Sequence, residues 1–180
     1  MYIYYINNKM GYITNVYSKL SHKQKKKILN FLQLNFISES NFENKMQLFS
    51  GIYNKNFEFE DSTIIILDID NDNNINGCIC LLYNDYLKEK LLYNNISLDY
   101  YIFLDNEKGC FIYNLCVNKN LRNQNIATNL VKFTIDKMKE INIIYLYTHA
   151  ENEISKNVFL KNNFDVKDKY ENIYVLHKNI

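Results

Sequence analysis

The sequence has no proline, no tryptophan and only four glycines, and its 21 basic residues include a single arginine, Arg122. The scarcity of proline and glycine excludes a collagen-like chain and a proline- and glycine-rich disordered one. Asparagine, in contrast, occurs 30 times in the 180 residues. Such a bias acts on the whole sequence, so a rare residue at a defined motif position carries more information than an abundant one.

An excess of one charge is lacking as well, because 21 basic residues are balanced by 20 acidic ones. A nucleic acid or an acidic membrane surface is attracted by a basic excess, so neither partner is expected. The longest purely aliphatic stretch, residues 64–67, is far shorter than the roughly 20 residues of a membrane-spanning helix. The first residues also lack the basic segment of a secretory leader, and we expect an intracellular, cytoplasmic protein.

The four cysteines, Cys78, Cys80, Cys110 and Cys116, lie among apolar neighbours and do not have the spacing of a zinc site. We interpret them as reduced core residues, which agrees with an intracellular compartment. No metal cofactor is expected. The length and the 47% of hydrophobic residues exclude a disordered chain and indicate one domain over residues 1–180, with an insertion at about 84–108.

The hydrophobic pattern predicts strands and helices that alternate along the chain. Strands are expected at 2–6, 63–69, 77–83, 110–117, 143–149, 165–169 and 173–178, and helices at 21–36, 41–50, 126–140 and 152–161. The second and third strands predict a hairpin across an asparagine-rich turn, and the segment 110–149 predicts a βαβ unit. The fold class is therefore α/β with a sheet of mixed direction.

The residues that follow the strand at 110–117 resemble the pyrophosphate loop of the GNAT superfamily of acetyl-CoA-dependent N-acetyltransferases. In that family a strand ending in valine precedes Arg/Gln-x-x-Gly-x-Gly/Ala and a helix, and Arg122, Asn125 and Ala127 stand at the three motif positions. A loop entering a helix presents unpaired N–H groups at the positive end of the helix dipole, which suits a phosphate. Asn125 departs from the family's glycine, but asparagine tolerates left-handed backbone better than other residues with a side chain.

Residues 144–164 resemble the next strand and helix of the same family, which typically ends in Asn-x-x-Ala-x-x-x-Tyr-x-x-x-Gly-Phe. The corresponding residues, without a gap, are Asn152, Ser155, Phe159, Asn163 and Phe164. The resemblance covers about residues 110–178 well. It implies the GNAT fold, a mixed central sheet splayed at the acetyl-CoA site with flanking helices, and it implies acetyl-CoA as cosubstrate.

By this resemblance the cosubstrate lies in a gap between the strands at 111–117 and 143–149. The backbone amides of Leu115, Cys116 and Val117 would bind its pantetheine arm. The implied pyrophosphate loop consists of Arg122, Asn123, Gln124, Asn125, Ile126, Ala127 and Thr128, and Asn152 and Phe159 are expected to contact the cosubstrate as well.

Acetyl transfer to an amine needs a neutral amine, a donor for the oxyanion and a route for the proton. The family often has a glutamate or tyrosine base where this chain has Phe111, and a tyrosine acid where it has Phe159, and neither phenylalanine can transfer a proton. Tyr147 stands where related enzymes have a histidine or glutamate base, and strand alternation puts His149 on the same face. Tyr147 and His149 are the candidate catalytic residues, with packing as the alternative role for each. Tyr113, which alternates with Leu115 on its strand, is expected to line the acceptor side. His22 and His177 are expected to lie far from these residues and are assigned no role.

Three functions stay open for the acceptor. The run from Tyr113 to Asn129 resembles organellar and bacterial-type enzymes that acetylate protein N-termini and lysines, and this is the leading hypothesis. The second is a small-molecule acetyltransferase, for example one for an amino-sugar phosphate, because that group of enzymes tolerates a residue other than glycine at the position of Asn125. The third is a domain that binds acetyl-CoA with weak catalysis, which Phe111 and Phe159 would explain.

Overall fold

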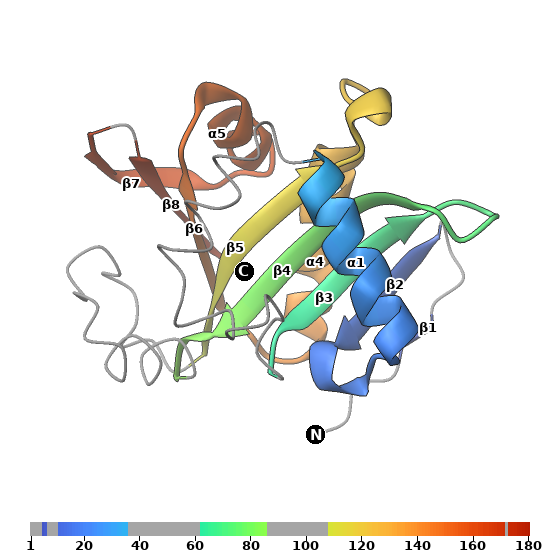
Figure 1. Ribbon diagram of the computed structural model, residues 1–180. Helices are drawn as coiled ribbons and strands as arrows, with labels where there is room; N and C mark the ends of the chain where they lie inside the picture. Colours follow the sequence, from blue (N-terminus) through green and yellow to red (C-terminus); the bar gives the residue numbers. More distant parts are fainter. Residues whose placement is uncertain (1–4, 7–10, 36–61, 86–107, 172) are drawn as a thin grey trace.

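The computed structural model describes residues 5–6, 11–35, 62–85, 108–171 and 173–180 (Figure 1). The strands are β1 (Tyr5–Ile6), β2 (Tyr12–Val16), β3 (Ile64–Ile69), β4 (Ile75–Tyr83), β5 (Gly109–Val117), β6 (Tyr145–Ala150), β7 (Asp165–Tyr170) and β8 (Ile173–Asn179). The helices are α1 (His22–Asn35), α4 (Ile126–Glu140) and α5 (Glu153–Leu160). None of these helices is long and apolar enough to cross a membrane.

The strands of the described residues form one sheet in the order β1-β2-β3-β4-β5-β6-β8-β7. Neighbouring strands run antiparallel except β5 and β6, which are parallel. Parallel neighbours need a crossover connection, and α4 provides it. The βαβ unit is thus confirmed, as is the hairpin of β3 and β4.

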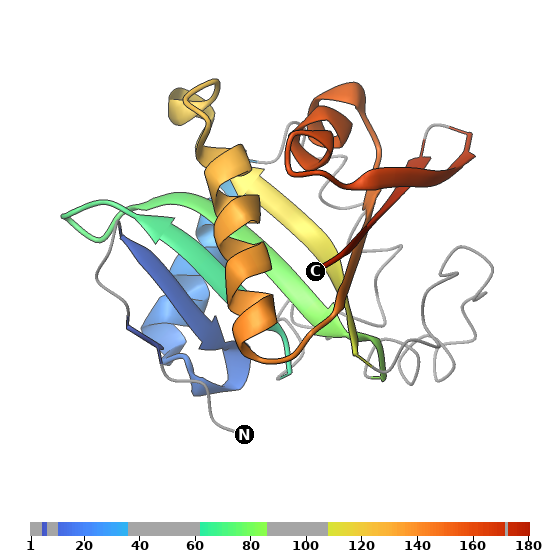
Figure 2. The ribbon, with the colours of Figure 1, turned by 180° about the vertical axis from the view of Figure 1, so that it is seen from behind.

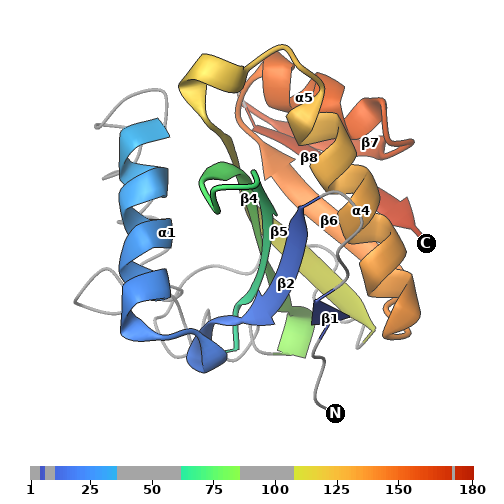
Figure 3. The ribbon, with the colours of Figure 1, turned by 90° about the vertical axis from the view of Figure 1, so that its right-hand side faces the viewer.

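Helices cover both faces of the sheet. Helix α1 lies on one face and α4 on the other, as the front and back views in Figures 1 and 2 and the side view in Figure 3 show. Phe31 and Leu32 of α1 belong to one buried apolar cluster, and Leu130 and Val131 of α4 belong to a second. Because both faces are covered, β4 and β5 are apolar along nearly their whole length, as is typical of strands buried on two sides.

The α/β class and the mixed sheet predicted from the sequence are confirmed, and α4 begins and ends at the predicted residues. Strand β2 was not predicted. Gly11 precedes it with φ +71°, its carbonyl accepts a hydrogen bond from the Ile69 N–H, and a Cβ at this position would lie 2.2 Å from the Ile69 carbonyl oxygen. Only glycine fits this close approach of the two strands without strain.

Some predictions fall on residues that the structure does not describe. The helix expected at 41–50, nearly all of the insertion at 84–108 and the first part of the strand at 2–6 lie outside the described residues. The single domain over residues 1–180 stays a prediction. Cys78, Cys80, Cys110 and Cys116 are free and buried, which confirms their assignment as reduced core residues.

Candidate active site

The two central strands separate at Ile112 and Thr148. Pairing between β5 and β6 extends from Gly109 with Tyr145 to Ile112 with Thr148, and the remainder of β5 has no register partner on β6. Figure 1 shows β5 and β6 diverging along part of their length. Thr148 is buried, and its hydroxyl donates a hydrogen bond of 2.8 Å to the Ile112 carbonyl, which ties the strands together where they part.

A bulge in β5 adds to the separation. Cys80 of β4 is in register with Asn114, whereas the next residue, Leu81, is in register with Ile112, so Tyr113 is the extra residue. The bulge also ends the alternation of Tyr113 with Leu115, because Tyr113 belongs to the cluster under α1 and Leu115 packs against the cluster under α4. A bulge bends a strand and redirects its side chains and backbone groups.

A cavity of about 540 Å³ lies in the resulting gap, between the end of β5, the loop after it, and α5. Most of the site residues predicted from the sequence line it: Tyr113, Leu115, Cys116, Val117, Arg122, Asn123, Asn125, Ile126, Ala127, Thr128, His149, Asn152 and Phe159. Gln124 and Tyr147 do not. Among the described residues, no cluster of three His, Cys, Asp or Glu side chains could hold a metal ion.

The loop between β5 and α4 is built by asparagines. The Asn118 side chain accepts a hydrogen bond of 3.0 Å from the Asn120 N–H and starts a short 3-10 turn. Asn123 and Asn125 then take left-handed backbone, with φ 64° and 60°. Asn125 is the N-cap of α4, yet its side chain makes no capping hydrogen bond. The first turn of α4 therefore presents its N–H groups to the cavity without a side-chain cap, which suits an anion.

Arg122 is held by the end of α1. Its guanidinium donates a hydrogen bond of 2.5 Å to the backbone carbonyl of Asn35, the last residue of that helix. Asn35 is buried and lines the cavity. Arg122 thus lies at the cavity with its side chain fixed, and the contact between it and a residue 87 positions earlier had no signal in the sequence.

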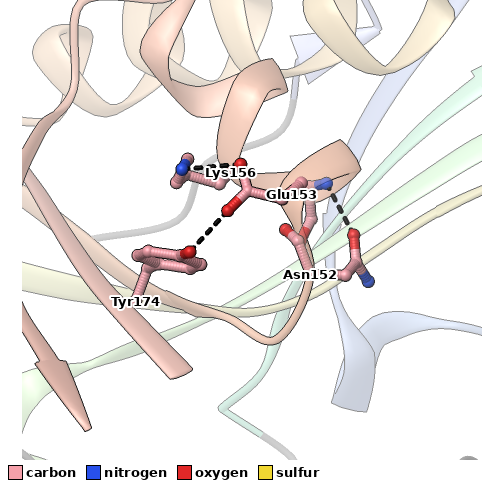
Figure 4. A network of polar contacts seen from close by, with 5 residues as sticks. Asn152, Glu153, Lys156 and Tyr174 are labelled. Carbon is pink, nitrogen blue, oxygen red and sulfur yellow. Dashed lines mark hydrogen bonds and ion pairs between the residues drawn. The ribbon is translucent and has the colours of Figure 1, made fainter. Parts of the chain in front are cut away.

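Helix α5 forms the opposite wall, and polar contacts fix its N-terminus (Figure 4). The Asn152 side chain accepts a hydrogen bond of 2.8 Å from the Ser155 N–H as the N-cap of the helix. Glu153 accepts a hydrogen bond from the Tyr174 hydroxyl of β8 and pairs with Lys156 at 2.6 Å. The hydrogen bond from Lys156, followed by that from Tyr174, lowers the pKa of the Glu153 carboxyl.

Phe111, Tyr147 and His149 form an aromatic group on the α1 face of the sheet. The Phe111 ring centroid lies 4.9 Å from that of Tyr147 and 5.1 Å from that of His149, in an edge-on arrangement with the imidazole. Tyr147 is fully buried, whereas His149 is partly exposed and lines the cavity. The predicted common face of Tyr147 and His149 is therefore present, but only the imidazole reaches the cavity.

His177, to which the sequence suggested no role and which was expected to lie far from the site, lies beside this group. It is in register with Tyr147 across β6 and β8, and its ring stacks on Tyr145 with centroids 5.6 Å apart. Burial lowers the pKa of His177 and raises that of Tyr145. The antiparallel register of β8 on β6 brings these residues together, and no spacing in the sequence indicates that register.

Two further predicted residues are engaged in the core. The hydroxyls of Tyr113 and Thr63 share a buried hydrogen bond of 3.0 Å. Phe159 is buried against Phe164 with ring centroids 5.1 Å apart, although it also reaches the cavity wall. Neither the Phe159 ring nor that of Phe111 can carry a proton.

Comparison with known proteins agrees with this geometry. A model of the acetyltransferase (GNAT) family matches residues 28–164. A curated relative, GCN5-related N-acetyltransferase 6, chloroplastic, from Arabidopsis thaliana, is 28% identical over 67 residues, which are 35% of this chain and 23% of that protein. The chain thus matches less than a quarter of the length of this relative.

Solved structures share the fold over nearly the whole chain. The PaiA N-acetyltransferase of Thermoplasma acidophilum in complex with coenzyme A has a TM-score of 0.61 at 14% identity and covers 95% of this chain and 100% of its own. Arylalkylamine N-acetyltransferase 2 of Aedes aegypti has a TM-score of 0.58 at 18% identity, with coverages of 97% and 100%. The ribosomal-protein-S18-alanine N-acetyltransferase of Escherichia coli has a TM-score of 0.57 at 9% identity, with coverages of 94% and 94%.

Proposed function

The chain belongs to the acetyltransferase (GNAT) family, and we propose that it transfers an acetyl group from acetyl-CoA to a primary amine of a protein, either an N-terminus or a lysine. Acetyl-CoA is the cosubstrate of this family and supplies an activated acyl group. The observation that carries the proposal is the parting of β5 from β6 next to the uncapped N-terminus of α4, both on one cavity.

The residues around this cavity suit the two ends of acetyl-CoA. The end of β5 pairs with β4 on one edge and has no register partner on β6 on the other, so the backbone on that open edge, among Leu115, Cys116 and Val117, would bind a pantetheine arm, which carries amide groups itself. The left-handed Asn125 turns the chain so that the first N–H groups of α4 point along the helix axis toward a pyrophosphate. Arg122 adds the guanidinium that binds phosphate oxygens with charge-assisted hydrogen bonds.

We assign proton transfer to the His149 imidazole, because it reaches the cavity and histidine changes its protonation near neutral pH. It would take the proton from the attacking amine, directly or through water. The fully buried Tyr147 would orient the Phe111 ring by packing, and Phe111 in turn contacts the His149 ring. An α-amino group, whose ordinary pKa is about 7.7 to 8.0, needs less help to lose its proton than a lysine at about 10.4.

The charges on the cavity wall support a protein amine over an amino-sugar phosphate. The cationic side chains among the described lining residues are Arg122 and Lys161, which belong to the phosphate loop and to the end of α5. Tyr113 and His149, near the point where the strands part, contribute a phenol and an imidazole and no lysine or arginine cation. A sugar phosphate would need a cation of its own on the acceptor side.

The proposal is tested with purified protein, acetyl-CoA and three acceptors. The first is a lysine-free peptide with a free α-amino group. The second is a variant of this peptide with a blocked N-terminus and one internal residue replaced by lysine. The third is glucosamine phosphate. Released thiol and the mass of the product report the reaction. Acetylation of either peptide, well above that of the sugar, is expected; a preference for the sugar would overturn the choice of acceptor.

The role of His149 is tested in the same assay. His149→Gln is expected to lower kcat by about a hundredfold, the lower end of general base catalysis, with unchanged affinity for CoA. His177→Gln serves as the control, because His177 is not among the residues that line the cavity. CoA binding without thiol release from any acceptor in the wild-type protein would favour the third hypothesis, a binding domain with weak catalysis.

A further inference from the structure

Asn35, the last residue of α1, joins that helix to the loop after β5 through two hydrogen bonds, and a third lies within the helix. Its side-chain oxygen accepts a hydrogen bond of 2.9 Å from the Lys119 N–H, and its backbone carbonyl accepts one of 2.5 Å from the Arg122 guanidinium. Its side-chain nitrogen donates a hydrogen bond of 2.7 Å to the carbonyl of Phe31, one turn earlier in α1. The amide is thus oriented on both sides, and 7% of the residue is exposed.

The contacts combine two features of a helix end. The last carbonyls of a helix have no partner within it, and the negative end of its dipole favours a cation. Helix α1 has no basic residue in its own last turn, so Arg122 of the loop supplies that cation. The Lys119 N–H, at the start of the 3-10 turn, is paired by the Asn35 side chain and by no residue of its own loop.

Helix α1 is itself anchored on the acceptor side of the site. Phe31 and Leu32 lie in the same buried cluster as Phe111, Tyr113 and Tyr147. The end of α1 is therefore fixed relative to the aromatic group, and the loop is fixed relative to the end of α1. A loop with two left-handed residues would otherwise lose more backbone entropy when it orders around a ligand.

We propose that Asn35 is a positioning residue for the cosubstrate, which holds the loop from Asn118 to Asn125 in its anion-binding conformation and keeps Arg122 at the cavity. This inference rests on the proposed binding of acetyl-CoA. It adds a residue outside the family's loop motif, from a helix on the other side of the site, that sets the affinity for the pyrophosphate end of the molecule and leaves the pantetheine end unaffected.

The hydrogen bond can be broken from either partner. Asn35→Ala removes the acceptor, and Lys119→Pro removes the N–H. Proline is tolerated at the first position of a helical turn, and Asn118 before it has ψ 123°, which suits a residue preceding proline. Lys119→Ala is the matched control, because it removes the same charge and keeps the N–H.

We expect Asn35→Ala and Lys119→Pro each to weaken CoA binding by about tenfold, and the double variant to weaken it by no more than either single one. Binding of pantetheine, which lacks the pyrophosphate, should change less than about twofold, and kcat at saturating acetyl-CoA should stay near that of the wild type. Lys119→Pro keeps the test open if Asn35→Ala fails to fold.

Calorimetry with CoA and with pantetheine decides the question. The proposal is supported if both single variants lose affinity for CoA but not for pantetheine, and if Lys119→Ala loses affinity for neither. Unchanged CoA affinity, or an equal loss for both ligands, overturns it and leaves the proposed function intact. A wild-type protein that does not bind CoA refutes the proposed function itself, and this inference with it.

Discussion

Asn125 offers the sharpest test of the phosphate loop, because its left-handed backbone is the one departure from the family's glycine that the site has to accommodate. Its φ is 60° and its ψ is 10°, and its side chain caps nothing. Replacement by alanine removes no hydrogen bond of the side chain, so the change in stability measures the backbone conformation alone. With glycine, asparagine, alanine or valine at this position, the stability of the protein should follow the tolerance of each residue for the left-handed region.

The magnitude follows from the cost of that region. Left-handed backbone costs an alanine about 1–2 kcal/mol. Because the same conformation also has a smaller cost for asparagine, Asn125→Ala should lose about 1 kcal/mol of stability. For a chain of this size that lowers Tm by about 2–4 °C. Asn125→Gly should lie within about 0.5 kcal/mol of the wild type, because relief of strain is offset by the entropy of glycine in the unfolded chain.

Binding gives a second, independent measure. If alanine turns the loop out of its left-handed conformation, the N–H groups at the start of α4 no longer converge, and CoA affinity should fall by up to about tenfold, which corresponds to 1.4 kcal/mol. Asn129→Ala is the matched control, since Asn129 is exposed in the first turns of the same helix and alanine is the better helix former. Its Tm should stay equal or rise slightly.

Thermal unfolding and calorimetry with CoA are sufficient for this series. The wild type with asparagine and the glycine variant should have the highest Tm and CoA affinity. The alanine variant should be lower in both, and the β-branched valine variant lowest. An alanine variant as stable as the glycine variant, with the same affinity for CoA, would refute the left-handed conformation at Asn125 and the reading of this loop as a phosphate cradle.

Two further predictions concern the walls of the cavity. Thr148→Val should lower stability by about 1–3 kcal/mol, because the Ile112 carbonyl loses its buried hydrogen bond where the strands part, whereas Thr148→Ser should retain most of it; urea unfolding compares the two. Glu153 has a pKa below its ordinary value of 4.5, so its ion pair with Lys156 stabilises the fold above that pH and this contribution is lost as the pH falls through the lower folded value. Glu153→Gln should therefore flatten the acid limb of Tm against pH between about 5 and 3, and an unchanged limb would contradict the role of this contact.

The cavity wall that we propose for the cosubstrate could be predicted as a group of neighbouring residues, because these residues are contiguous in the sequence. One strand, one loop and one helix supply Val117, Arg122, Asn125 and Thr128, and all four line the cavity. Hydrophobic periodicity fixes the two elements, and the loop between them is too short for its residues to lie elsewhere. The same holds for Asn152 and Phe159 in the next helix.

The acceptor side could not be predicted to the same extent, because it depends on register and on contacts over long sequence separations. Strand alternation correctly put Tyr147 and His149 on one face, but the depth of each side chain follows from what α1 and β8 cover. Neither the position of His177 beside Tyr147 nor the contact of Asn35 with Arg122 has a local pattern. The bulge at Tyr113 likewise arises from the pairing of β4 with β5.

The abundance of asparagine has a structural consequence that composition alone did not show. Six described residues other than glycine have a positive φ, and five of them are asparagines: Asn73, Asn123, Asn125, Asn142 and Asn163. Two of these, Asn125 and Asn163, stand where the family pattern has glycine. Because asparagine is the residue with a side chain that best tolerates this region, a chain with four glycines can keep the turns of its fold at a modest cost. Asparagine thus stands in for glycine at these turns, whereas no other side chain offers the bidentate geometry of a guanidinium, and the single arginine stands at the start of the loop that we propose as the phosphate site.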